Sequence, residues 1–403
     1  MFNYQITASN IPTGFSATGL PAGLRVNAST GLISGTLTTN GTFPVVISAL
    51  NAGGTGSATL VITVNFNGAQ GSYVGLAAAG GTNAGLFTLS LTPKGGFTAK
   101  LSLAGAQYPF RTTFSSDGTL TYAVRVGAAL LQMALTVDPS LPGVSGIINV
   151  TTASSSNTYS VKSTLLGSFN RTHPLPSVLA KNYTLVIPAE SGTGPKLPQA
   201  PGYGTLSVAT TGAVHIAGKL GDGTAFSAAG QLHADRQTCT LFAPLYAGKN
   251  PGSIAGNIIF ESSTDSDSDG VLNWIKPQQT SGSYYSGGFS MSVDLMAAKY
   301  AATPLASGTG GTFTLGGGNL PDSAICDSLT ISSKDKVTVS GINGVTLTLT
   351  PGTGAFSGGF FYPGMNKNRK ISFGGVIYQK PAPAAGYGLF LGTDQCGGVE
   401  ISQ

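Results

Sequence analysis

The sequence predicts an all-β protein made of several domains, on three observations. Glycine supplies 59 of the 403 residues, about twice its usual share of roughly 7%. Charged residues make up only 9%, against about 25% in an average globular protein. Short runs that alternate apolar and polar residues recur between glycine turns, and no window keeps a helical apolar period. A chain of 403 residues exceeds one ordinary hydrophobic core, so about two to four such domains are expected.

Residues 1–65 form the first predicted domain, a β-sandwich. Its strand-like runs are residues 4–8, 14–17, 24–26, 32–35, 43–48 and 58–64. Turn-forming residues separate several of these runs, at 20–23, 29–31 and 40–41, with the glycine, proline and asparagine that tight turns favour. About six short strands at this spacing are typical of a sandwich.

Three stretches of this domain carry a resemblance to a known family: FSATGLPAGL at residues 15–24, TGLISGT at 30–36 and NAGGTG at 51–56. They resemble the cadherin-like or Ig-like modules, known as putative Ig domains, of large bacterial surface proteins. The resemblance implies an Ig-like sandwich that acts as a spacer or adhesion unit, and an extracellular or cell-surface location. Such modules usually begin one strand earlier, so we expect a truncated N-terminus, which also fits the lack of a visible signal sequence.

One phrase recurs three times: GGFTAKL at residues 95–101, GAVHIAGKL at 212–220 and GAFSGGF at 354–360. Such self-similarity indicates that one supersecondary unit was duplicated. The polar position of the phrase is Thr98, His215 or Ser357. Because this position alternates with apolar neighbours, we expect it on the surface or in a lumen of the sheet.

The repeats predict three further domains of glycine-rich antiparallel strands, at residues 66–175, 176–304 and 305–403. Glycines within strands suit strongly coiled sheets and barrel corners, and closure would remove exposed edges in a chain so poor in charge. We therefore predict barrel-like units; open sandwiches, or one larger barrel shared by two copies, are the alternatives. These regions resemble uncharacterised β-repeat regions of surface proteins from environmental bacteria, a resemblance that implies no particular activity.

An acidic segment after residue 264 predicts a calcium site. Asp265, Asp267 and Asp269 alternate with serine and precede a glycine, a pattern that wraps oxygen ligands around Ca²⁺. Val271 would add its carbonyl, and Asn273 its side chain or a water. The twelfth position is lysine instead of glutamate, which excludes a helix-loop-helix calcium site. The alternative is a solvated loop without a metal.

Aromatic residues follow the acidic segment. Trp274 is the only tryptophan, and Tyr284 and Tyr285 are near it in sequence. Aromatic rings beside a polar loop can form a platform for a sugar or another flat ligand. The alternative is that Trp274 anchors a barrel core.

The histidines offer the candidate acid–base groups. His233 is close to Asp235 and Arg236 in sequence, and His215 lies inside the repeated phrase. The sequence contains no Gly-x-Ser-x-Gly nucleophile motif and nominates no pair of carboxylates for glycoside hydrolysis. A Ser–His–Asp site assembled from distant strands stays open.

Charge and cysteine content limit the partners. The net charge is +5, but the basic residues are scattered apart from a group at 367–370, so nucleic-acid binding is not expected. The sequence contains no run of 18 apolar residues, so we expect no transmembrane helix. Cys326 and Cys396 could pair in a secreted protein, which would leave Cys239 as a buried apolar residue or a reactive thiol.

These patterns favour a secreted or cell-surface modular β protein with a binding, adhesion or structural role, stabilised by Ca²⁺. Its ligand would be a carbohydrate, another surface polymer or a small molecule. The alternative is a Ca²⁺-dependent hydrolase of an ester, lactone or glycan, with His233 or His215 as the base. The sequence leaves the ligand, the strand pairing and the oligomeric state open.

Overall fold

The computed structural model describes residues 2–37, 41–138, 143–189, 196–248, 251–280, 284–302, 310–320, 325–332, 337–341, 344–362 and 370–402. Within these ranges the regular elements are all β-strands and none is a helix, which confirms the all-β prediction. The described part of the chain therefore contains no helix with the length and hydropathy of a membrane span. Most of the basic group at 367–370, and residue 40 of a predicted turn, lie outside these ranges.

The N-terminal module contains the six predicted strands in two three-stranded sheets. One sheet has the order β1 (Phe2–Gln5), β4 (Leu32–Gly35) and β3 (Leu24–Val26). The other has the order β2 (Gly14–Thr18), β5 (Gly41–Asn51) and β6 (Gly54–Val64). Both sheets contribute apolar side chains to one core, which includes Ile33, Val45 and Ile62.

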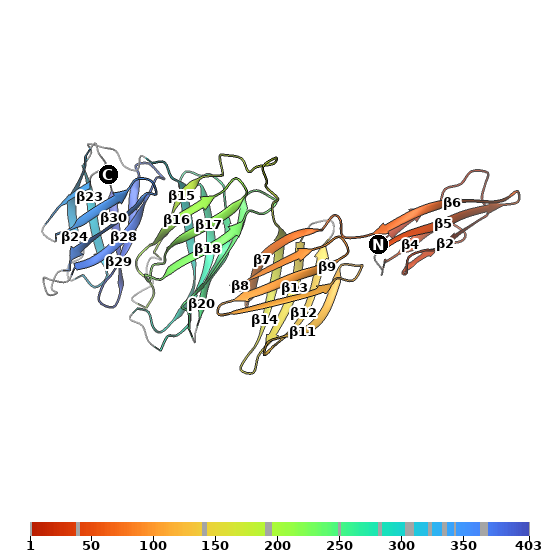
Figure 1. Cartoon of the computed structure of the whole chain (residues 1–403), viewed down its shortest axis with the longest axis horizontal. Coiled ribbons are helices and arrows are strands. Elements are labelled where there is room, and N and C mark those ends of the chain that lie inside the picture. The colour runs from red at the N-terminus through yellow and green to blue at the C-terminus, as the bar shows by residue number, and fades with distance from the viewer. Residues whose placement is uncertain are drawn as a thin grey trace. The chain divides into compact units, whose positions relative to one another are not determined.

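Three eight-stranded sheets follow (Figure 1). Sheet 1 contains β7 (Gly71–Ala79), β8 (Thr82–Leu91), β9 (Gly96–Leu103), β10 (Ala106–Thr113), β11 (Thr119–Val126), β12 (Ala129–Asp138), β13 (Gly143–Thr151) and β14 (Ser156–Leu165). Sheet 2 contains β15 (Asn182–Ile187), β16 (Gly202–Val208), β17 (Ala213–Lys219), β18 (Ala225–Gln231), β19 (Thr238–Leu245), β20 (Gly252–Ile259), β21 (Ser268–Lys276) and β22 (Phe289–Lys299). Sheet 3 contains β23 (Gly310–Gly317), β24 (Ile325–Ile331), β25 (Val337–Ser340), β26 (Thr346–Thr350), β27 (Ala355–Phe361), β28 (Lys370–Tyr378), β29 (Ala385–Leu391) and β30 (Cys396–Ser402).

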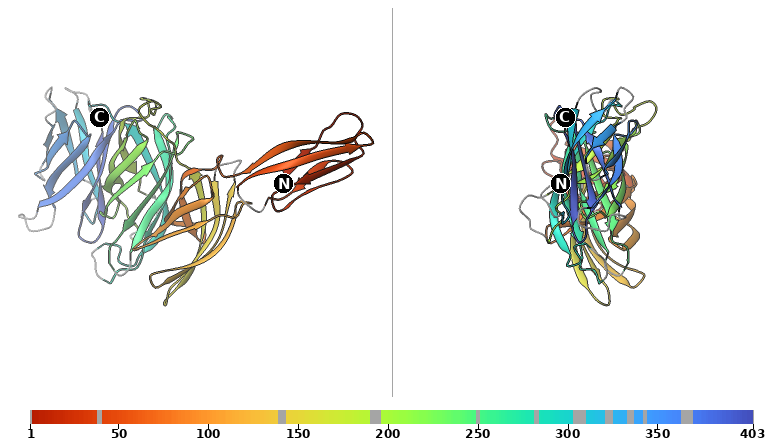
Figure 2. Two further views of the ribbon diagram at one scale, coloured as in Figure 1. Left: turned by 45° about the vertical axis from the view of Figure 1, so that its right-hand side comes forward. Right: turned by 90° about the vertical axis from the view of Figure 1, so that its left-hand side faces the viewer.

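Each eight-stranded sheet curls so that its first and last strands pair with each other. These closing pairs are β7 with β14, β15 with β22, and β23 with β30. The two ends of each ladder are therefore strands that follow each other in the sequence: β10 and β11, β18 and β19, and β25 and β26. The result is three nearly closed, antiparallel, barrel-like sheets, and their curl can be followed in Figure 2. The barrel-like prediction is confirmed, with one sheet for each repeat and no sheet shared between repeats.

The interiors of the sheets are filled with apolar side chains. In β12 the burial alternates along the strand, with Leu131, Met133, Leu135 and Val137 turned inward, as the two-residue period of a strand requires. Sheet 2 encloses one large cluster that includes Trp274, and sheet 3 encloses another. Burying one such large apolar side chain stabilises the fold by about 1.5–3 kcal/mol.

The repeated phrase forms the same local hairpin in all three sheets. Its first glycine has a positive φ each time, 82° at Gly95, 77° at Gly212 and 73° at Gly354, a conformation that glycine adopts without steric cost. The phrase is the third strand of sheets 1 and 2 but the fifth strand of sheet 3. The third copy therefore keeps the turn and changes its place in the sheet.

The polar position of the phrase lies outside each sheet. Thr98, His215 and Ser357 are all exposed, while the apolar residue before each of them is buried. The expectation of a surface or lumen position is therefore resolved in favour of the outer surface.

Contacts within the chain group it into two compact units. The first contains residues 1–79, 87–101 and 108–165, and the second contains residues 80–86, 102–107 and 166–403. The division into four domains at residues 66, 176 and 305 stays a prediction. The second unit contains sheets 2 and 3, and the candidate site lies within it.

Sheets 2 and 3 pack against each other through outward-facing apolar side chains. Val186 and Ala298 of sheet 2 form one buried cluster with Val376 and Tyr378 of sheet 3. The Tyr203 side chain of sheet 2 contacts the backbone of sheet 3 at Gly374, where an added Cβ would lie 2.5 Å from the tyrosine hydroxyl. A side chain at position 374 would therefore require the Tyr203 ring to move.

Candidate functional site

The acidic segment predicted to bind calcium lies between β20 and β21. Its second half is strand, because Asp269, Val271 and Asn273 belong to β21. Alternate residues of a strand are about 6.6 Å apart along its axis, so these groups do not converge as they would in a loop. Gly270 also serves the sheet, since a Cβ on it would lie 2.2 Å from the carbonyl oxygen of Asn257.

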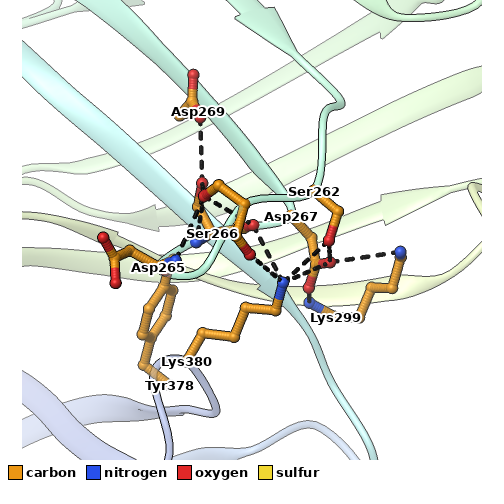
Figure 3. A network of polar contacts seen from close by, with 9 residues as sticks. Ser262, Asp265, Ser266, Asp267, Asp269, Lys299, Tyr378 and Lys380 are labelled. Carbon is orange, nitrogen blue, oxygen red and sulfur yellow. Dashed lines mark hydrogen bonds and ion pairs between the residues drawn. The ribbon is translucent and has the colours of Figure 1, made fainter.

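The three carboxylates are consequently held apart. Asp265 and Asp269 are exposed, whereas Asp267 is buried with 6% of its surface accessible. Figure 3 shows the carboxylates of Asp265, Asp267 and Asp269 pointing in different directions. Within the described residues no three His, Cys, Asp or Glu side chains form a group that could hold a metal ion. Calcium binding stays a prediction, and the separated carboxylates of Asp265, Asp267 and Asp269 do not support it.

Asp267 accepts hydrogen bonds from three residues around it. The Ser262 hydroxyl donates to Oδ1 at 2.8 Å, and the backbone N–H of Lys299 donates to Oδ2 at 2.9 Å. The ammonium groups of Lys299 and Lys380 lie 3.4 Å and 3.0 Å from Oδ1. Burial by itself would raise the pKa of Asp267, but the hydrogen bonds from Lys299, Lys380 and Ser262 outweigh it and lower the pKa to about 2. Asp267 is therefore a charged, fully bonded group in neutral solution.

The ammonium group of Lys380 is surrounded by oxygens of the acidic segment. It donates to Ser262 Oγ at 3.0 Å, Ser263 O at 2.8 Å, Ser266 O at 3.2 Å and Asp267 Oδ1 at 3.0 Å (Figure 3). We call these four oxygens the ammonium site. Hydroxyl, carbonyl and carboxylate oxygens are also the groups that bind Ca²⁺. In this protein they receive a cation that belongs to the chain itself.

The ammonium site joins sheet 2 to sheet 3. Lys380 follows β28 of sheet 3, and the oxygens it contacts precede β21 of sheet 2. The hydroxyl of Tyr378 donates to the carbonyl oxygen of Asp265 at 2.8 Å. Burial and then the nearby carboxylates, Asp267 foremost among them, raise the pKa of Tyr378, so this phenol keeps its proton and remains a donor. The segment thus acts as a polar joint beside the apolar cluster of Val186 and Tyr378.

Trp274 lies in the core of sheet 2. It is 2% exposed and packs edge to face on Phe289, with ring centroids 4.7 Å apart. Its indole N–H donates to the Tyr246 hydroxyl at 2.9 Å. This environment agrees with the alternative prediction, in which Trp274 anchors a barrel core. A ligand platform of Trp274, Tyr284 and Tyr285 stays a prediction, and the rings of Trp274 and Tyr285 are both buried.

A buried ion pair lies next to this tryptophan. The Lys276 ammonium is 2.8 Å from Asp222 Oδ2, and their side chains are 7% and 0% exposed. The Tyr246 hydroxyl donates to the same carboxylate oxygen at 2.7 Å. Lys276 also donates to the carbonyl oxygen of Tyr284 at 2.9 Å and lies 4.7 Å from the centroid of the Tyr246 ring. Both charges are therefore paired and hydrogen-bonded, as burial requires.

His233 is buried, and Thr240 lies next to its Nε2. The two atoms His233 Nε2 and Thr240 Oγ1 are 3.0 Å apart, and Thr240 donates its proton to Asn257 Oδ1 at 2.8 Å. Because that proton is used, Nε2 of His233 must be the donor toward Thr240. Burial lowers the pKa of His233, an effect that Asp235 partly offsets. Burial thus favours the neutral form of His233, which belongs to a polar chain with Thr240 and Asn257.

His215 is an exposed residue of β17. It lines an open groove on the outer face of sheet 2, together with residues of β15, β16 and β18. The structure therefore separates the two histidines: His233 is buried, and His215 is exposed. A catalytic role for either residue stays a prediction.

The three cysteines are unpaired. Cys326 is exposed, whereas Cys239 and Cys396 are fully buried, so a Cys326–Cys396 bridge is not formed. Burial raises the pKa of the Cys239 and Cys396 thiols to about 12. These two residues therefore behave as small apolar groups and not as thiolates.

Several residues of the joint and of the buried ion pair escaped sequence reasoning. Lys380 lies 113 residues after its Asp267 partner, and Lys276 lies 54 residues after Asp222. No local spacing links such pairs. The one available signal was Lys276 itself, at the place where a calcium loop would carry glutamate.

One comparison with known proteins identifies the N-terminal module. The family model described as "Putative Ig domain" matches residues 2–65. The N-terminal module is an Ig-like domain. This confirms the resemblance seen in the sequence for that part of the chain. No curated protein gives a significant match to the sequence.

Two solved structures align with the chain at very low similarity. A double mutant of the vaccine antigen transferrin binding protein B from Haemophilus parasuis aligns over 99% of this chain and 97% of its own, with 9% identity and a TM-score of 0.21. Endo-1,5-alpha-L-arabinanase from Thermotoga petrophila aligns over 82% of this chain and 97% of its own, with 8% identity and a TM-score of 0.19. Similarity at this level carries no argument about fold or function.

Proposed function

We propose that this chain is a secreted or cell-surface modular β protein that binds a surface polymer or another extracellular ligand. The observation that carries the proposal is that apolar side chains fill the interiors of sheets 2 and 3. Their interiors are apolar clusters of side chains, unlike barrels that enclose a ligand. A ligand of these sheets would therefore meet their outer faces and loops, which is the geometry of a binding or adhesion protein.

The Ig-like module supports the same proposal. The resemblance of residues 2–65 to modules of bacterial surface proteins favours a spacer or adhesion role outside the cell. The joint at Asp267 and Lys380 fixes sheet 2 on sheet 3, so that their outer faces keep one arrangement. Preorganised surfaces lose less entropy when they bind.

The test compares binding and turnover in the same sample. The purified chain would be incubated with immobilised polysaccharides and other surface polymers, and in parallel with model esters, lactones and glycans, with and without Ca²⁺. Retention on a polymer without turnover supports the binding role. Turnover that disappears in a His215→Ala or His233→Ala variant would replace it with the hydrolase alternative.

Location needs a separate measurement. Antibodies raised against the chain should label intact cells of the organism that encodes it, or detect the chain in the culture medium. Labelling that appears only after the cells are opened would contradict the extracellular proposal.

A further inference from the structure

A groove of about 500 Å³ crosses the outer face of sheet 2. Strands β15, β16, β17 and β18, which are neighbours in the sheet (Figure 1), form its floor. The turn at Gly352 and Thr353, between β26 and β27 of sheet 3, forms part of its wall. The hydroxyl of Tyr300 donates to the carbonyl oxygen of Pro351 and helps to hold this turn in place.

Strand register arranges the floor in two rows that run across the strands. Residues directly opposite each other on neighbouring strands define each row. The first row is Asn182, Ser207, His215 and Ala229, and the second is Thr184, Thr205, Ala217 and Ser227. With neighbouring strands about 4.8 Å apart, each row is roughly 14 Å long. This length suits a linear ligand that lies across the strands.

The polar groups of the rows are available for a ligand. The side chains of Asn182, Thr205, Ser207, His215 and Ser227 line the groove and make no hydrogen bond within the described part of the chain. At the end of the second row, Thr184 is fully buried and does not line the groove.

The small residues of the rows create the depth of the groove. Ala217 and Ala229 lie beside the polar side chains, and Gly352 belongs to the wall. A methyl group or a hydrogen at these positions leaves space that a larger side chain would fill. The groove is thus a recess with polar groups at its sides.

The chemistry of the lining selects a class of ligand. None of the groove-lining residues is Lys, Arg, Asp or Glu, so a charged polymer would find no ion pair there. An apolar ligand would leave the hydroxyl, amide and imidazole groups unpaired, which costs free energy. A neutral ligand rich in hydroxyl groups can both donate to and accept from such side chains.

We propose that this groove binds a neutral oligosaccharide chain lying across β15 to β18, an inference that rests on the proposed binding function and names its site and ligand class. An extended peptide suits the groove less well. The backbone groups of β15, β16 and β17 already pair with strands on both sides, so only β18, at the end of the ladder, could pair with an added peptide strand.

The test is a calorimetric titration of the full chain with neutral oligosaccharides, such as xylo-, manno- and cello-oligosaccharides. We expect His215→Ala and Ser207→Ala each to weaken binding about tenfold, the factor for losing one or two hydrogen bonds. Ala217→Trp should fill the recess and abolish binding. The matched control is Thr98→Ala, which changes the same position of the repeated phrase in sheet 1 and should bind as the unchanged chain does. Far-ultraviolet circular dichroism confirms that each variant is folded.

The possible results distinguish a failure of the groove proposal from a failure of the proposed binding function. Equal binding by the unchanged chain and by the groove variants would place the ligand elsewhere, which overturns the groove and leaves the binding function standing. Retention of charged polymers or neutral peptides alone would overturn the ligand class. Failure to bind any polymer would overturn both this inference and the proposed function.

Discussion

Asp267→Asn should destabilise the second unit by about 2 kcal/mol at pH 7. The pKa of Asp267 is about 2, below the ordinary 3.8 of an aspartate, and a difference of this size corresponds to about 2 kcal/mol of stabilisation when the group is charged. The amide keeps an oxygen that can accept from Ser262, but it removes the charge next to Lys299 and Lys380.

The pH dependence of this difference follows from its sign. Because the folded pKa lies below the unfolded one, the carboxylate stabilises the fold above pH 3.8, and that contribution is lost as the pH falls toward 2. A protonated Asp267 resembles an asparagine. The unchanged chain and Asp267→Asn should therefore differ by about 2 kcal/mol at pH 7 and converge near pH 2.

The assay is urea unfolding followed by tryptophan fluorescence. Trp274 is the only tryptophan of the chain and lies in the core of sheet 2, so the signal reports on the unit that contains Asp267. Asp265→Asn is the matched control, because it removes an exposed carboxylate of the same segment. A difference below about 0.5 kcal/mol at pH 7, within the usual effect of a surface change, would refute the reasoning. So would a difference that persists unchanged near pH 2.

Three further changes test other contacts of the second unit. Lys276→Met should cost about 3–5 kcal/mol, because it leaves the buried Asp222 charge unpaired, and the double change with Asp222→Leu should recover most of that loss; a single variant as stable as the double one would contradict this. Gly354→Ala should cost about 1–2 kcal/mol, since its φ is 73° and alanine is strained there, whereas Gly352→Ala, with no atom within 4 Å of its Cβ, should change the melting temperature little; equal shifts would refute the argument. Calcium or a chelator should leave the melting temperature of the unchanged chain constant, because Lys380 occupies the ammonium site, and a Lys380→Met variant should show a calcium-dependent rise; a rise in the unchanged chain would instead favour the predicted calcium site.

The fold could be predicted well wherever local chemistry decides it. Apolar alternation and turn residues located the six strands of the Ig-like module, and the glycine phrase located one hairpin in each repeat. Closure was expected from the need to protect edges. The place of the phrase in sheet 3 could not be predicted, because the phrase encodes only its own turn. Whether it becomes the third or the fifth strand depends on pairing with strands far away in the sequence.

For His215, at the polar position of the phrase, the sequence could predict the direction of the side chain but not its surroundings. Alternation with Val214 and Ile216 placed His215 away from the core, and the structure agrees. What surrounds it on the outer face depends on register, which brings Ser207 opposite it on β16, and on a turn of sheet 3. A phrase that reads as repeated scaffold therefore contributes, in one copy, to a groove.

In the acidic segment the sequence located a group of oxygens correctly but did not identify the cation that they bind. Alternating aspartates followed by glycine fit a calcium loop, but alternation is also the pattern of a strand, and pairing with β20 and β22 makes Asp269 part of β21. The oxygens before β21 still gather around a positive charge. Lys380 supplies that charge from another sheet, so its identity depended on tertiary contact and not on the local sequence. An oxygen-rich segment therefore predicts a cation more securely than it predicts a metal.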